Sequence, residues 1–131
     1  MTARTETQSI EIDADRDAVL ELLSDPRQLP EWAPAFADTI SGDAQAGWRA
    51  TKDGQDVEFR VVSRRDAGTV DFLREVAPGR QGGAYLRVVP RPGGGAVIVM
   101  TLPLSPGIDP AAVAATLRDE LDALARLIPG A

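Results

Sequence analysis

Tyr85 and Arg87 are the two side chains of this sequence whose types and spacing best suit chemistry on a bound molecule. They lie two residues apart in a segment that alternates like a strand, so both side chains share one face. If that face looks inward, the phenol and the guanidinium can together polarise a ligand carbonyl or supply a proton. The alternation does not choose between the two faces, and the outward position stays open.

Arg74 is a third candidate, because it shares a strand face with Val70, Phe72 and Val76. An arginine on an otherwise apolar face invites a carboxylate or a polarised carbonyl as its partner. The alternative is an arginine near the strand end whose methylene stem carries the charge to solvent. Arg74, Tyr85 and Arg87 are therefore catalytic candidates, and none is assigned a catalytic role outright.

The residue types that are missing limit the chemistry further. The chain contains neither histidine nor cysteine, which excludes Ser-His-Asp triads, thiolate nucleophiles, disulfides and the usual zinc, iron or copper ligand sets. We predict no metal site and no cofactor. The formal charge of −6, from 20 acidic and 14 basic side chains, repels phosphate backbones, so we predict no nucleic-acid partner.

The apolar pattern predicts strands in the middle of the chain and helices towards both ends. Residues 5–12 end in strand alternation, and residues 18–23 have helical spacing that one of the acids at positions 13, 15 and 17 is expected to cap. Asp25 can cap a short second helix with Pro26 in its first turn. Hairpin-like turns then separate six predicted strands, at residues 39–41, 48–52, 56–63, 69–76, 84–89 and 96–102.

The last segment is one long amphipathic helix that Asp109 caps and Pro129 ends. Its apolar residues recur at spacings of three and four and form a single stripe: Val113, Leu117, Leu121, Leu124 and Ile128. A sheet with one apolar face needs a cover, and this helix is long enough to provide it. We therefore predict an α+β fold in which a curved antiparallel sheet closes on the long C-terminal helix, with two short helices at the open end and residues 1–131 in one domain.

These elements resemble those of the SRPBCC, or START-like, superfamily, which includes polyketide cyclases, aromatases, lipid-transfer domains and pollen-allergen-like proteins. The resemblance covers nearly the whole chain and rests on four places: the first strand and helix at residues 9–23, the segment from Ser24-Asp25-Pro26 to Trp32, Gly93-Gly94-Gly95 before an apolar strand, and the terminal helix. It implies a helix-grip fold with an internal apolar cavity, and it implies no particular reaction.

Aromatase/cyclase members look most similar in length and layout, and they are thought to steer a reactive polyketide by the shape of a pocket with polar groups inside. The polar positions of their central strand fall at Val57, Phe59, Val61 and Ser63 of this chain. Three of these four residues are apolar, so most of that polar set is missing here.

The wall of the implied cavity is predicted from the residues expected to face inward. Val57, Phe59 and Val61 share one strand face, and they either line a pocket or pack on the last helix. Trp32 either closes the pocket mouth or anchors the second helix in the core. The predicted ligand-binding residues are Trp32, Val57, Phe59, Val61, Phe72, Tyr85, Val113, Leu117 and Leu121.

Three functions are compatible with these features. The first is binding of an apolar small molecule, such as a polyketide, lipid or isoprenoid, by burial of apolar area. The second is a cyclase-like enzyme that folds a flexible substrate, with Arg74, Tyr85 or Arg87 as polar helpers. The third is an interaction module whose groove grips a partner protein. No targeting segment and no run long enough to span a membrane is visible, so we expect a cytoplasmic protein, and the oligomeric state stays open.

Overall fold

The computed structural model describes residues 4–131 of the chain. Its elements, in chain order, are β1 (Thr5–Ile12), α1 (Arg16–Leu23), the 3₁₀ turn η1 (Pro26–Gln28), α2 (Leu29–Trp32), β2 (Thr39–Asp43), β3 (Gly47–Lys52), β4 (Gln55–Arg64), β5 (Thr69–Ala77), β6 (Arg80–Pro90), β7 (Ala96–Pro103) and α3 (Pro110–Leu127). Each strand and helix expected from the sequence is present.

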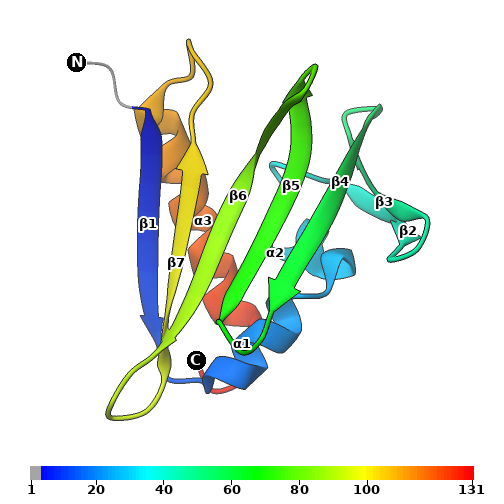
Figure 1. Ribbon diagram of the computed structural model, residues 1–131. Coiled ribbons are helices and arrows are strands. Elements are labelled where there is room, and N and C mark those ends of the chain that lie inside the picture. Colours follow the sequence, from blue (N-terminus) through cyan, green and yellow to red (C-terminus); the bar gives the residue numbers. More distant parts are fainter. Residues whose placement is uncertain (1–3) are drawn as a thin grey trace.

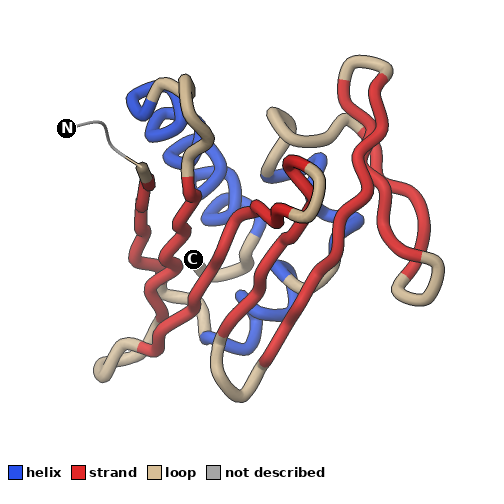
Figure 2. Tube along the Cα trace, turned by 45° about the horizontal axis from the view of Figure 1, so that its top comes forward, coloured by secondary structure: helices blue, strands red, loops and turns tan. Residues whose placement is uncertain are grey.

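The strands form one sheet in the order β1-β7-β6-β5-β4-β3-β2, in which neighbouring strands are antiparallel. The long helix α3 runs along the sheet and packs against β1, while α1 and α2 lie near its C-terminal end (Figure 1). Figure 2 shows the helices on one side of the strands. The predicted helix-grip arrangement of the α+β class is therefore confirmed.

Two of the three predicted helix caps are present. The Asp25 carboxylate accepts a hydrogen bond from the backbone N–H of Arg27, and the Asp109 carboxylate accepts one from Ala111 N–H, both at 3.1 Å. Each of these acids precedes a first-turn proline, whose missing N–H needs no partner there. The residue before α1 is Asp15, and its side chain makes no capping hydrogen bond. The expectation of a side-chain cap on α1 is therefore wrong.

The start of β6 also differs from expectation, since the strand begins at Arg80 rather than at residue 84. The segment 78–83 was expected to be a turn because it is rich in glycine. Instead, Gly83 pairs with Leu73 of β5, and a Cβ atom at Gly83 would overlap the Phe72 carbonyl oxygen. Glycine here allows a close approach of two strand backbones, which is a role that composition cannot distinguish from a turn.

The apolar core lies between α3 and the inner face of the sheet. Val70, Leu86 and Met100 are cross-strand partners on β5, β6 and β7, and all three are fully buried. They belong to one buried cluster with the apolar stripe of α3 and its C-cap residue: Leu117, Leu121, Leu124 and Ile128. Because strand side chains alternate, the burial of Leu86 and Val88 fixes which face of β6 looks inward.

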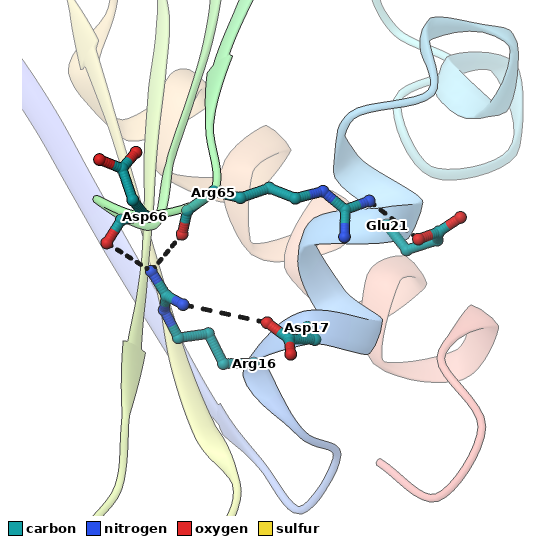
Figure 3. Close-up of polar contacts among 5 residues, drawn as sticks. All are labelled: Arg16, Asp17, Glu21, Arg65 and Asp66. Atoms are coloured by element: carbon teal, nitrogen blue, oxygen red, sulfur yellow. Dashed lines mark hydrogen bonds and ion pairs between the residues drawn. The ribbon is translucent and has the colours of Figure 1, made fainter.

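A set of polar contacts holds α1 against the turn between β4 and β5 (Figure 3). Arg16 of α1 donates to the backbone carbonyl oxygens of Arg65 and Asp66, and Arg65 donates to the Glu21 carboxylate at 2.8 Å. The exposed ion pair between Arg65 and Glu21 is worth at most about 1 kcal/mol. The bonds from Arg16 to main-chain oxygens connect the helix to the sheet backbone itself, and this connection helps to position the α1–α2 segment that carries Trp32.

None of the helices among the described residues is long and apolar enough to cross a membrane.

Candidate functional site

A hollow of about 820 Å³ lies between the inner face of the sheet, α2, α3 and the loop that joins β7 to α3. Its walls come from the helical segment and the loop after it (Leu29, Trp32, Ala33, Ala35, Phe36), from the sheet (Phe59, Phe72, Leu73, Arg74, Val76, Arg80, Gln81, Gly82, Gly83, Ala84, Met100, Leu102), and from the last loop and helix (103–109, Ala112, Val113, Thr116, Leu117, Glu120). Most of these side chains are apolar. The volume is in the range typical of small-molecule pockets.

Aromatic rings form part of the wall in two edge-to-face pairs. Trp32 meets Phe72 with ring centroids 5.8 Å apart, and Phe36 meets Phe59 at 5.6 Å. Such pairs contribute about 0.5–1.5 kcal/mol beyond the area that they bury. They connect the α2 region to β5 and β4, and they present rigid apolar surface to the hollow.

Trp32 also brings a polar group to this region. Its indole Nε1 is buried and has no hydrogen-bond partner among the described residues. A buried donor without a partner costs about 1–3 kcal/mol. Because Nε1 is closed to solvent, the part of Trp32 that lines the hollow is the apolar part of its ring.

Glu120 is the acidic residue of α3 that lines the hollow, and it is half-buried. Desolvation by burial raises the pKa of its carboxyl to about 7, and the negative charge of Asp119 acts in the same direction. Near neutral pH this carboxyl is therefore partly protonated, and it can donate or accept a proton inside the hollow.

The raised pKa of Glu120 predicts that the free energy of unfolding decreases as pH rises from about 4.5 to about 7. In this window the unfolded chain has lost the proton that the folded protein still holds, so rising pH favours unfolding. Below the window both states are protonated, and above it both are ionised. We expect Glu120→Gln to be more stable than the parent by about 1–3 kcal/mol at pH 8 and to differ much less at pH 4.5.

Urea denaturation of the parent and Glu120→Gln at several pH values measures this difference. The control is Asp119→Asn, which removes only the smaller cause of the shift and should keep most of the pH dependence. Parallel stability profiles for the parent and Glu120→Gln would contradict the prediction.

The structure brings six of the predicted site residues together in the wall of the hollow: Trp32, Phe59, Phe72, Arg74, Val113 and Leu117. Trp32 is 2% exposed and lines the hollow, so it is both a core residue and a wall residue. Three other predicted residues, Val57, Val61 and Leu121, do not line the hollow. Leu121 is fully buried in the core, whereas Val57 and Val61 are half-buried on β4.

Tyr85 and Arg87 lie on the outer face of the sheet, away from the hollow. They alternate with Leu86 and Val88, which are buried in the core, and the cross-strand partners of Tyr85 are Asp71 and Thr101. Tyr85 and Arg87 therefore do not face inward, which was one of the two positions considered from the sequence. The cause is the strand period, which sends Tyr85 and Arg87 outward because Leu86 and Val88 belong to the buried core on the side of the sheet that the helices cover.

Glu120 is a titratable residue in the wall of the hollow that the sequence analysis did not identify. It follows Val113 and Leu117 by seven and three residues, so it lies on the apolar stripe of α3 rather than on the solvent side. An acid within an apolar stripe is the signal that could have identified it. The walls contributed by residues 80–83 and 103–109 had no comparable signal, because those segments were expected to be turns or loops.

Among residues 4–131, no group of three or more acidic side chains is placed to hold a metal ion.

Comparisons with known proteins give a family and a fold. The model of the family described as "Polyketide cyclase / dehydrase and lipid transport" matches residues 4–129. A START superfamily protein from Mycobacterium smegmatis is similar in structure, with a TM-score of 0.70, 13% identity, and coverage of 96% of this chain and 97% of that chain. No curated protein matches the sequence.

Two further solved structures come from biosynthetic loci. The di-domain ARO/CYC BexL from the BE-7585A pathway has a TM-score of 0.69 and 21% identity, and the match covers 95% of this chain and 46% of BexL. DynU16, from the dynemicin biosynthetic locus, has the same TM-score and identity, with 95% and 47% covered. This chain therefore matches about half of each of these two proteins. At these identities the likeness concerns the fold alone.

Proposed function

Because the chain belongs to the polyketide cyclase / dehydrase and lipid transport family, whose model spans residues 4–129, we propose that it binds an apolar small molecule of polyketide or lipid type. The observation that carries this proposal is the hollow of about 820 Å³ with largely apolar walls between the sheet and α3. The ligand occupies this hollow and takes the place of water there.

Burial of apolar area provides the affinity. A ligand that buries about 300 Å² of apolar surface away from water gains about 7.5 kcal/mol at 25 cal/mol per Å². Lost translational and rotational freedom offsets part of this gain, so we expect a dissociation constant between about 10 μM and about 1 mM. The edge-to-face pair of Trp32 and Phe72 limits the shape of the ligand.

A cyclase-type enzyme is the second candidate, and the carboxyl of Glu120 favours it. With a pKa of about 7, this group can take a proton from the carbon between two ketones of a bound chain. The resulting enolate carbon then forms a bond to another carbonyl carbon of the same molecule. The Glu120 carboxylic acid returns the proton to the new alkoxide, so the product is an isomer of the substrate and no co-reactant is needed.

Native mass spectrometry of freshly expressed protein tests the binding proposal first, because a tightly held ligand should appear as added mass. The purified protein is then mixed separately with a linear poly-β-ketone mimic, a fatty acid and a sterol, and the melting temperature is measured. A ligand at a hundred times its dissociation constant stabilises the folded state by about 2.7 kcal/mol. We expect at least one class to raise the melting temperature.

Recovery of the molecule after incubation separates the two candidate functions. A carrier returns the molecule unchanged in mass and in chromatographic retention, whereas a cyclase returns a compound of different retention. If no added mass is found and no class changes the melting temperature, the proposed binding function is wrong.

A further inference from the structure

The sheet is split between β4 and β5. The N-terminal half of β4, from Gln55 to Phe59, pairs with β3, and its C-terminal half, from Arg60 to Arg64, pairs with β5. Beyond Leu73, β5 pairs only with β6 among the described residues. The two strands separate at this point, as Figures 1 and 2 show.

A second hollow, of about 640 Å³, lies at this split. The hairpin of β2 and β3 forms one side and the tip of the β5–β6 hairpin forms the other. It shares five wall residues with the larger hollow: Phe59, Leu73, Arg74, Arg80 and Gln81. The two hollows are therefore neighbours, and the side chains between them belong to both.

The charge of the second hollow is opposite in sign to that of the whole protein. Four arginines (Arg49, Arg60, Arg74, Arg80) line it together with two glutamates (Glu58, Glu75), giving a local formal charge of +2 in a chain of −6. A local field of this sign attracts anions.

Within residues 4–131, three of these arginines have no ionic partner, and two of the three make no side-chain hydrogen bond either. Arg49 pairs with Glu58 at 2.9 Å, and Arg60 donates to the neutral side chain of Gln81 at 2.6 Å. Arg74 and Arg80 make no ion pair within residues 4–131. Both of them are also wall residues of the larger hollow.

We propose that the ligand is an amphiphile with a carboxylate at one end, and that Arg74 and Arg80 bind this carboxylate while the apolar body fills the larger hollow. The planar guanidinium matches the geometry of a carboxylate and can hold it with two parallel hydrogen bonds. Because both arginines lie on the boundary of the two hollows, one molecule can place its carboxylate against them and its apolar body in the larger hollow. This inference rests on the proposed binding function and adds the chemical class of the ligand.

A matched pair of fluorescent probes tests the carboxylate preference. 1-Pyrenebutyrate and 1-pyrenebutanol share an apolar ring system and a chain. Pyrenebutyrate ends in a carboxylate, whereas pyrenebutanol ends in a neutral hydroxyl. We expect the parent protein to bind pyrenebutyrate at least tenfold more tightly than pyrenebutanol at low salt. The advantage should decrease as salt is added, because the two arginines are exposed.

The variant Arg74→Gln/Arg80→Gln should lose that advantage and bind both probes with equal affinity. Its affinity for pyrenebutanol should stay within twofold of the parent value. The matched control is Arg87→Gln, because Arg87 also makes no ion pair within the described residues but lies on the outer face of the sheet. This control should bind both probes as the parent does.

The outcomes separate the two proposals. The carboxylate inference is overturned if pyrenebutanol binds and pyrenebutyrate binds no more tightly. It is also overturned if Arg87→Gln loses the preference for pyrenebutyrate as fully as the double variant does. In both cases the proposal of apolar binding stands. If neither probe binds, and the fatty acid, the sterol and the polyketide mimic also fail, the binding function itself is overturned.

Discussion

Replacing Val113 by tryptophan is expected to weaken binding of an apolar ligand about a hundredfold without unfolding the protein. Val113 is half-buried on α3 and lines the larger hollow, so the indole projects into space that the ligand would occupy. If the indole displaces about 100 Å² of ligand contact, the loss is about 2.5 kcal/mol. Valine and tryptophan have similar helix propensities, so α3 itself should not change.

Ala115→Trp is the matched control for this variant. Ala115 lies on the same helix, is exposed, and does not line the hollow. Titration of both variants with 1-pyrenebutanol measures the effect, and a melting curve of each shows that the fold is retained. Equal affinities for Val113→Trp, Ala115→Trp and the parent would place the ligand outside the hollow and would refute the proposed site.

Replacing Leu121 by alanine is expected to lower the free energy of unfolding by about 3 kcal/mol, within the range of 2–5 kcal/mol known for buried leucines. Leu121 is fully buried at the centre of the α3 stripe, where the helix meets the inner face of the sheet. The substitution loses the transfer free energy of the removed carbon atoms and leaves a void that the neighbouring side chains fill only in part. A typical domain is stable by about 5–15 kcal/mol, so this is a large fraction.

Leu127→Ala provides the same chemical change six residues later on the same helix. Leu127 is 37% exposed, so its truncation should cost less than about 1 kcal/mol. Urea denaturation of both variants gives the two free energies, with equal m-values expected if the unfolded states are alike. A Leu121→Ala variant no less stable than Leu127→Ala would mean that α3 does not close the core as described.

Local patterns predicted the elements of this fold correctly. The bounds of β1 and the capping of η1 and α3 depend on residues that are close in sequence, such as Asp25 beside Pro26. The stripe of α3 depends on a helical period that the chain sets by itself. The START-like resemblance read from these features is confirmed by the family match over residues 4–129.

The site was predicted less well, because its residues come from distant parts of the chain. Phe59, Phe72 and Val113 were named as wall residues because each lies on an apolar face, and all three line the hollow. Leu121 lies on an equally apolar face but is packed in the core. Periodicity shows that a side chain is buried. It does not show whether the side chain packs against other protein atoms or faces a cavity.

The sequence by itself determined the class of fold, the order of its elements and the absence of histidine and cysteine chemistry, because these follow from composition and from short-range periods. Only the tertiary structure decided that Tyr85 and Arg87 face outward, that the carboxyl of Glu120 lies in an apolar wall, and that Arg74 and Arg80 stand at a split in the sheet. The physical reason is that the side chains of a strand alternate between two faces, and either face can be the buried one until another element packs against it. In this protein the helices that pack on one side of the sheet, α1 and α3 among them, make that choice.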